Sequence, residues 1–209
     1  MMPRIHPLAL VLSLTVAAAA CASGDMTPTS PPETALQAAV AVPPPPPPAA
    51  VCLEFNVPAL WTVYTAPGTP PGTMVFVENG ISVTTRRFYD AALNPYYNGA
   101  RIEPGQGWLG ADPSARLNNI SLQFGFGGLP FVPSQVTIDY HDKGGFENLT
   151  FNATPLRIGQ LETLGGGGVA IAWWWAGFNK EGRVSIAGPV GTATIGGQEL
   201  WIDTVCAWP

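Results

Sequence analysis

The chain has 209 residues, a formal net charge of −5 and only 11% charged residues, against 46% hydrophobic ones. Without Arg4, which lies in a predicted signal sequence, eight basic residues face 14 acidic ones, and Arg86-Arg87 is the only basic doublet. Proteins that bind nucleic acid neutralise phosphates with clustered lysines and arginines. The composition therefore excludes nucleic acid as an expected partner.

Residues 1–20 have the layout of a secretory signal peptide. Arg4 and His6 form a short basic region, 8–16 is apolar, and 17–20 are four alanines. The apolar stretch from Leu8 to Ala22 has 15 residues, whereas a membrane-spanning helix needs about 20. We expect 1–20 to be removed on export and to leave no transmembrane helix.

The cysteine at position 21 follows directly on this signal. The run Ala18-Ala19-Ala20-Cys21 resembles the lipobox of bacterial lipoproteins, although that pattern prefers leucine where Ala18 stands. The resemblance implies that Cys21 carries a lipid anchor, which makes the membrane a partner. Two alternatives stay open: ordinary cleavage that leaves a soluble periplasmic or secreted protein, and an intermolecular disulfide through Cys21.

Residues 21–50 are predicted to be a disordered, proline-rich tether. Six consecutive prolines occupy 43–48, and the surrounding residues are mostly Ala, Val, Thr and Ser. Such a composition cannot bury a core, and the proline run favours an extended polyproline II conformation. We interpret the segment as a spacer; a proline-motif ligand for a partner groove is the alternative.

Residues 51–209 are predicted to form one all-β domain. Apolar and polar residues alternate over 81–84, 120–126, 136–140, 148–152 and 184–186. Glycine-containing turn signals lie between them at 79–80, 127–128, 143–145, 165–168 and 196–197. A period of two is typical of half-buried antiparallel strands. About ten such strands predict an antiparallel two-sheet β-sandwich, jelly-roll-like in its connections.

Two cysteines bracket this domain. Cys52 opens the first expected strand and Cys206 closes the last one. In an oxidising compartment thiols pair, and the terminal strands of a jelly roll commonly lie side by side. We therefore predict a Cys52–Cys206 disulfide, which leaves Cys21 available for lipidation.

Several segments of the domain carry a family resemblance. They read CLEF at 52–55, GISVT at 80–84, NNISLQF at 118–124, VTIDY at 136–140, GGFENLTFN at 144–152 and IGGQELWID at 195–203. The pattern resembles bacterial surface β-sandwich domains of the anchor-associated (choice-of-anchor-like) type. It is more distantly similar to jelly-roll carbohydrate-binding modules. The resemblance implies a fold and a surface location, and it implies no catalytic residue.

Catalytic chemistry finds little support in the residues of the domain. A Ser-His-Asp triad would have to use His141, the single histidine, which stands beside Asp-Lys-Gly-Gly and is expected in a solvated turn. Zinc is disfavoured because neither a second domain histidine nor a free thiolate pair is present. Glycoside hydrolysis needs two carboxyl groups across a cleft, for which Glu54, Glu199 and Asp203 are the candidates.

Calcium is the metal that the residues favour most. Hard oxygen donors stand beside flexible glycines, which suits calcium. The resemblance to jelly-roll modules, which often hold a structural calcium near their terminal strands, implies a second group there. The first group is Asp139, Asp142, Glu147 and Asn148, and the second is Glu54 and Asp203. Neither group has EF-hand spacing. We therefore predict a structural calcium ion as an option, with solvated turn carboxylates as the alternative.

The most unusual local feature is the triplet Trp173-Trp174-Trp175. Neighbouring residues of a strand face opposite ways, so Trp173 and Trp175 should share a face with Val169. One of the two faces should be core, which would leave at least one indole exposed. An exposed indole can stack on a sugar ring or anchor a protein interface. The alternative is that all three rings are covered.

These features together predict a non-enzymatic cell-envelope lipoprotein with a structural or protein-contact role. A carbohydrate-binding module that uses exposed tryptophans is the alternative, and a secreted glycan hydrolase is a third reading. The expected partners are the membrane, reached through the lipid, and a glycan or an envelope protein.

Overall fold

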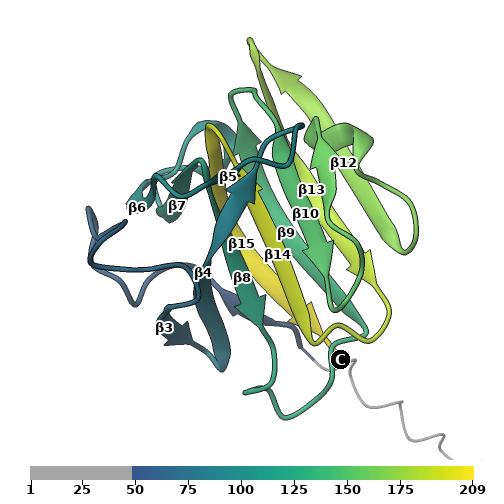
Figure 1. Cartoon of the computed structure of the whole chain (residues 1–209). Helices are drawn as coiled ribbons and strands as arrows, with labels where there is room; N and C mark the ends of the chain where they lie inside the picture. Colours follow the sequence, from purple (N-terminus) through teal and green to yellow (C-terminus); the bar gives the residue numbers. More distant parts are fainter. Residues whose placement is uncertain (1–48) are drawn as a thin grey trace, which may run out of the picture. The chain divides into compact units, whose positions relative to one another are not determined.

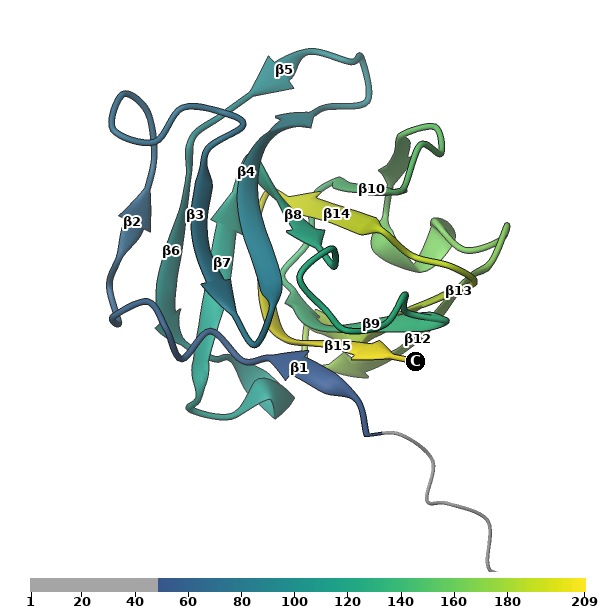
Figure 2. The ribbon, with the colours of Figure 1, turned by 90° about the horizontal axis from the view of Figure 1, so that it is seen from below.

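The computed structural model describes residues 49–209. The predicted signal sequence, Cys21 and nearly all of the predicted tether lie outside the described residues. Residues 51–208 form two antiparallel sheets that pack against each other, as Figure 1 and Figure 2 show from two directions. The predicted all-β, two-sheet sandwich is therefore confirmed.

The larger sheet has eight strands, and its last strand along the chain lies near its centre. β1 pairs with the end of that strand, β15, beside the main path. In spatial order the strands are β12 (Val169–Ala176), β13 (Asn179–Ala187), β9 (Gln135–Asp142), β15 (Leu200–Trp208), β7 (Pro113–Asn118), β6 (Gly99–Pro104) and β2 (Val63–Tyr64), with β1 spanning Val51–Leu53.

The smaller sheet has seven strands, and consecutive strands of the chain repeatedly cross from one sheet to the other. β7 and β9 belong to the larger sheet, whereas β8 and β10 belong to the smaller one, which is the jelly-roll-like feature of the fold. In spatial order the strands are β11 (Arg157–Gly159), β10 (Glu147–Phe151), β14 (Thr192–Gly197), β8 (Ile120–Gly125), β4 (Ile81–Tyr89) and β3 (Met74–Glu78), with β5 (Pro95–Tyr96) paired to β4. Two short 3-10 helices are η1 (Gly107–Leu109) and η2 (Leu161–Thr163).

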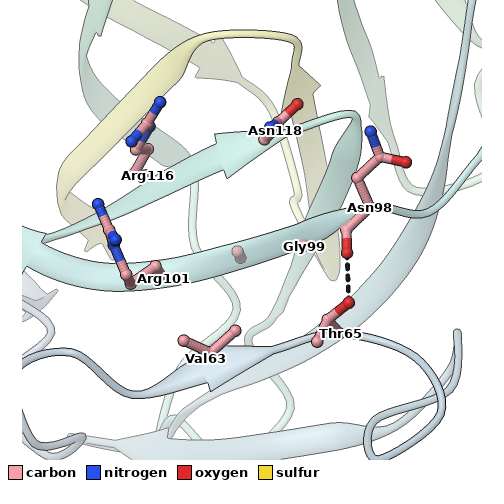
Figure 3. Close-up of a pocket in the computed structure, with 8 residues that line it drawn as sticks. Val63, Thr65, Asn98, Gly99, Arg101, Arg116 and Asn118 are labelled. Atoms are coloured by element: carbon pink, nitrogen blue, oxygen red, sulfur yellow. Dashed lines mark hydrogen bonds between the residues drawn. The ribbon is translucent and has the colours of Figure 1, made fainter.

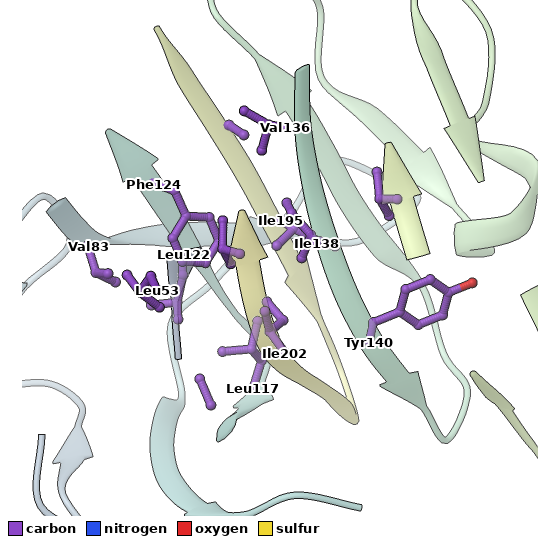
Figure 4. Close-up of a cluster of buried hydrophobic side chains, with 14 of the residues drawn as sticks. Leu53, Val83, Leu117, Leu122, Phe124, Val136, Ile138, Tyr140, Ile195 and Ile202 are labelled. Atoms are coloured by element: carbon purple, nitrogen blue, oxygen red, sulfur yellow. The ribbon is translucent and has the colours of Figure 1, made fainter. Parts of the chain in front are cut away.

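The core lies between the sheets and uses every second residue of the central strands. Figure 4 shows Leu122 and Phe124 from β8 meeting Ile138 from β9 and Ile202 from β15. All four side chains are fully or almost fully buried. Burial of apolar surface at about 25 cal/mol per Å² is the main favourable term for such a sandwich. In these central strands, the period of two in the sequence therefore indicates directly which side chains are buried in the core.

A β-bulge in β15 changes which residues face the core. The pairing of β15 with β9 shifts between Ile202 and Val205, so Asp203 and Thr204 together occupy the place opposite the single residue Asp139. Because a bulge adds one residue to one strand, the alternation restarts with Val205 and Ala207 inward. Cys206 consequently lies on the outer face.

The predicted disulfide is confirmed. Cys52 and Cys206 are directly opposite residues of β1 and β15, and their sulfurs are bonded. The first and last strands of the domain are therefore joined on the outer face of the larger sheet. The bridge closes a loop with a sequence separation of 154 residues.

One predicted turn is wrong. Gly196 and Gly197 do not break the chain, because both belong to β14 and pair with Ser121 and Ile120 of β8. A Cβ added at Gly196 would lie 2.0 Å from Ser121 Oγ. Glycine is required there for close approach of two strands, and the turn begins only at Gln198.

Among residues 49–209, no helix is both long enough and apolar enough to cross a membrane.

Candidate functional site

The tryptophan triplet lies on β12, at the edge of the larger sheet. Trp173, Trp174 and Trp175 are 40%, 43% and 61% exposed, and Phe178 in the following turn is fully exposed. Figure 1 shows the β12–β13 hairpin reaching beyond the neighbouring strands at that end. The expectation that one face of the triplet is core is wrong, and so is the alternative that all three rings are covered.

The alternation of the indoles is as predicted, although neither face is buried. Trp174 lies opposite Glu181 on the outer face of the sheet, while Trp173 and Trp175 lie opposite Gly182 and Lys180. Only the start of β12 packs on the core, where Val169 is 6% exposed. The tryptophans come after the point where the core ends, and no further strand covers them among the described residues.

The indole rings do not form one flat surface. The rings of Trp173 and Trp175 are 5.7 Å apart at 84° to each other, and Trp174 meets Trp108 at 5.1 Å and 66°. The ammonium of Lys180 lies 5.6 Å from the ring centre of Trp175. Edge-to-face contacts stabilise such pairs, but they leave separate ring faces pointing in different directions.

A buried polar network lies under Trp108 on the outer face of the larger sheet. Glu181 is 3% exposed and accepts hydrogen bonds from the Trp108 backbone N–H at 3.1 Å and from Trp174 Nε1 at 3.2 Å. Its Oε1 also lies 2.9 Å from Nδ1 of His141. The network attaches η1 to the hairpin that carries the tryptophans.

The expected location of His141 is wrong. It belongs to β9, is 3% exposed, and packs edge-on against Trp201 at 5.8 Å. The strand alternation continues past Tyr140, and the η1 segment covers the outer face that would otherwise be solvated. Within residues 49–209 no serine hydroxyl hydrogen-bonds to either ring nitrogen, and Nε2 is buried without a partner there. A triad based on His141 is not assembled in this arrangement.

The structure separates Asp139 and Asn148 from the other two residues of the first predicted calcium group. Asp139 lies on the outer face of β9 and pairs with Arg183, with Nη2 2.7 Å from Oδ2. Asp142 and Glu147 are buried, at 1% and 0% exposure, and are therefore not solvated turn carboxylates. Asn148 is also buried and binds the backbone of Tyr89. Odd and even positions of β9 point to opposite faces, which explains the separation.

Asp142 and Glu147 form the centre of a buried acidic cluster with η2. Leu161 N–H donates to Glu147 Oε2 at 2.9 Å, and Gly144 N–H donates to Asp142 Oδ1 at 2.7 Å. Asp142 Oδ2 and Glu147 Oε1 are buried without hydrogen-bond partners among the described residues. Burial, and then repulsion by Asp142, raises the pKa of Glu147 to about 8. Burial also raises the pKa of Asp142.

The second predicted calcium group is brought together. Glu54 and Asp203 line one small pocket of about 180 Å³ together with Asp112. Burial, followed by the charges of Asp112, Asp139 and Glu54, raises the pKa of Asp203 to about 7. Across residues 49–209, however, no three Asp, Glu, His or Cys residues are arranged to hold a metal ion. Glu199, the third carboxylate considered for hydrolysis, lies apart in the exposed β14–β15 turn.

A shallow pocket of about 310 Å³ lies on β2, β6 and β7. Figure 3 shows its lining residues, which include Val63, Thr65, Asn98, Gly99, Arg101, Arg116 and Asn118. Both arginines already have neighbours. Arg101 Nε donates to Glu103 at 2.6 Å, and the guanidinium of Arg116 lies 5.0 Å over the ring of Trp201. Arg101 is therefore paired within the sheet, whereas Arg116 Nε is buried without a hydrogen-bond partner among the described residues.

Comparison of the chain with protein-family models, with curated proteins and with solved structures gives no significant match. The resemblance to anchor-associated surface domains therefore stays a prediction.

Sequence reasoning missed Trp108 and Glu181 as parts of the tryptophan surface. They lie 73 positions apart, and only the packing of η1 against β13 brings them within hydrogen-bond distance. The alternation around Glu181 places it on the outer face, but no local pattern indicates which loop covers that face.

Proposed function

We propose that this chain is a non-enzymatic, exported cell-envelope protein whose sandwich domain makes a protein contact through the free edge of β12. The observation that carries the proposal is the edge strand itself. Its eight residues, VAIAWWWA, include neither a charge nor a proline, and three of them are exposed tryptophans.

An edge strand presents unpaired backbone groups, and proteins normally protect such edges. The other sheet edges are short: β2 has two residues, β11 has three and β3 has five. β12 is longer and has no charged residue to discourage pairing. An edge of this kind is suited to strand addition, in which backbone hydrogen bonds give affinity and alternate side chains give specificity.

The partner that fits this edge is an extended segment of another protein chain with an apolar face. Tryptophans are frequent energetic anchors of protein interfaces. Trp175 and Phe178 present the largest exposed aromatic surface of the hairpin, and Trp174 is held in place by its hydrogen bond to Glu181. The edge therefore supplies a strand template with aromatic anchors on both faces.

Substitution of Ala172 by glutamate should abolish this contact while leaving the fold intact. Ala172 is exposed and lies opposite Arg183, so the new carboxylate meets a cation across the strands. The same charge opposes pairing with an incoming strand. A photoreactive residue at position 170 of β12, in the producing cells, should crosslink to a polypeptide, which mass spectrometry identifies.

The matched control is Met74→Glu on the edge strand β3, where Met74 is 61% exposed. The crosslink should persist in that variant and be lost in Ala172→Glu and in Trp175→Ser. Crosslinking to polysaccharide or lipid alone, or an equal yield in all variants, would contradict a protein contact at β12.

Membrane attachment through a lipid on Cys21 belongs to the same proposal. Pairing of Cys52 with Cys206 leaves Cys21 as the remaining cysteine of the chain. We expect Cys21→Ser to move the protein from the membrane fraction to the soluble fraction of the envelope and to stop incorporation of labelled fatty acid. Continued sedimentation of this variant with membranes would count against the anchor.

Carbohydrate binding by the exposed indoles is a second candidate. It is favoured by separate exposed ring faces, one of which lies beside the ammonium of Lys180. Because the rings are nearly perpendicular, each indole would stack on one sugar rather than on a continuous chain of sugars. A structural calcium ion at Glu54 and Asp203 also stays a proposal, since a cation there would offset the repulsion between their carboxylates.

A further inference from the structure

A groove of about 450 Å³ crosses the outer face of the smaller sheet, away from β12. Its floor is formed by side chains of the adjacent strands β8, β14 and β10, which lie directly opposite one another in the ladder. Gln123 of β8 lies opposite Thr194 of β14, which lies opposite Thr150 of β10. Because opposite residues of a ladder share a face, these three side chains point into the same space. The volume falls in the range of about 300–1,000 Å³ that small-molecule sites occupy.

Ser121 supplies a buried hydroxyl to this floor. It lies opposite Arg86 of β4 and Gly196 of β14, and its side chain is 1% exposed. Its Oγ has no hydrogen-bond partner among the described residues. Native proteins seldom leave a buried polar group unpaired, and each such group costs about 1–3 kcal/mol. The Oγ lies against Gly196 beneath the floor, so a ligand seated in the groove would pair with it after a rotation of the Ser121 side chain.

One wall of the groove is held rigidly. Tyr89, at the end of β4, is fixed by Asn148 of β10, which accepts from the Tyr89 N–H at 2.7 Å and donates to its carbonyl at 2.8 Å. Gly72 N–H donates to the Thr85 carbonyl at 2.7 Å, which attaches the loop before β3 to β4. An aromatic ring and a fixed backbone therefore border the polar floor.

The charge of the groove is opposite to that of the chain. Its lining contains Arg86 and Arg87 and no acidic residue, although the chain carries a net charge of −5. Arg86 donates through Nε and Nη2 to Gln123 Oε1, at 3.1 and 2.6 Å, which fixes the guanidinium over the floor. Arg87 is exposed and makes neither an ion pair nor a hydrogen bond within residues 49–209.

We propose that this groove binds an acidic saccharide. The hydroxyls of Ser121 and Thr194 and the amide of Gln123 match sugar hydroxyls, and Tyr89 offers an apolar surface for a ring. Thr150 Oγ1 already donates to the Thr154 carbonyl at 2.8 Å, so towards a sugar it can act only as an acceptor. The guanidinium of Arg87 matches a carboxylate or sulfate on the sugar. The groove lies on the opposite sheet from the tryptophan edge, so this inference does not depend on the protein contact at β12.

The test is calorimetric titration of the intact domain with acidic polysaccharides, namely polygalacturonate, alginate and heparin, and with neutral dextran and methyl-esterified polygalacturonate. We expect binding of at least one acidic polymer, weakened by salt, and no binding of the neutral ones. Arg87→Gln should lower the affinity about tenfold and reduce its salt dependence, because one charge contact is lost.

Ser121→Ala separates a ligand role from a structural one. Because the hydroxyl has no protein partner, its removal should leave the melting temperature unchanged or slightly raised, while the affinity falls about tenfold. Ser82→Ala is the control, since Ser82 lies on the same face of β4 and its hydroxyl donates to the Gly125 carbonyl outside the groove. Failure of every acidic polymer to bind, equal binding of neutral ones, or full affinity in both groove variants would overturn the proposal.

Discussion

Replacement of both Cys52 and Cys206 by serine is expected to lower the melting temperature of the domain by about 10 °C or more under oxidising conditions. The bridge closes a loop with a sequence separation of 154 residues. In the chain-entropy model this restricts the unfolded state by about 5 kcal/mol, which is the upper end of what disulfides contribute. For a domain of this size, 1 kcal/mol shifts the melting temperature by about 2–4 °C.

The structural reason for a large effect is the position of the bridge. β1 has only three residues, and it pairs solely with the end of β15. Without the bond, this short ladder would be the direct connection between the first and last strands, and β1 would be held by the burial of Leu53 and Phe55 and by the hydrogen bond from Asn79 to the Cys52 carbonyl. Differential scanning calorimetry of the double variant, with Cys21→Ser as the matched control, measures the effect. An unchanged melting temperature would show that the bridge contributes nothing to folding stability.

The domain is also expected to become less stable as the pH rises from about 5 to about 9. In the unfolded chain Glu147 ionises near its ordinary pKa of 4.5, whereas burial beside Asp142 raises its pKa to about 8 in the fold. Between these values the folded domain holds a proton that the unfolded chain has lost. Its contribution is therefore complete below about pH 4.5 and is lost as the pH rises through about 8.

The buried carboxyl of Asp203, with a folded pKa of about 7, acts in the same direction. The loss of stability from Glu147 is on the order of 2–5 kcal/mol, because a pKa that differs by one between the folded and unfolded chain corresponds to about 1.4 kcal/mol. Lys180 forms an ion pair with Glu162 near the cluster. Its positive charge lowers the pKa of both Asp142 and Glu147 and so reduces the repulsion between their carboxylates. Thermal denaturation at a series of pH values measures the slope.

Glu147→Gln is the decisive variant for this pH dependence. The amide cannot ionise, and its oxygen still accepts from Leu161 N–H, so the decline in melting temperature with pH should become shallower. The difference should be clearest between about pH 7 and pH 8, above the folded pKa of Asp203 and below that of Glu147. Glu199→Gln in the exposed β14–β15 turn is the matched control and should keep the wild-type slope. A steep slope that survives in Glu147→Gln would assign the pH dependence to other groups.

The fold was largely predictable because its main signal is local. Ile120, Leu122 and Phe124 alternate with polar residues, and the same three side chains are buried between the sheets. The predicted strand segments correspond to β4, β8, β9, β10 and β13. The exceptions are positions where contacts between two strands determine whether a strand continues or which face a side chain takes. Gly196 continues β14 because Ser121 of β8 needs the space, and the bulge at Asp203 reverses the alternation of β15.

The candidate sites were predictable only in part. The tryptophan triplet was recognisable as unusual, but its exposure depends on where the core ends below β12. The groove gave no signal, because Ser121, Gln123, Thr194 and Arg86 are ordinary strand residues whose common face arises from ladder register. The glycines after His141 suggest a turn, and only the packing of η1 over β9 buries that side chain.

The pairing of Cys52 with Cys206 was predictable from the sequence, whereas its place on the outer face of the larger sheet was not. The all-β class, the oxidised pair and most of the inward-facing residues follow from the amino-acid sequence, because a period of two and the chemistry of thiols are local signals. Which edges stay free, which faces loops cover and which polar side chains share a groove depend on the packing of the strands. Those properties depend on contacts between strands far apart in the chain, and no local pattern encodes them.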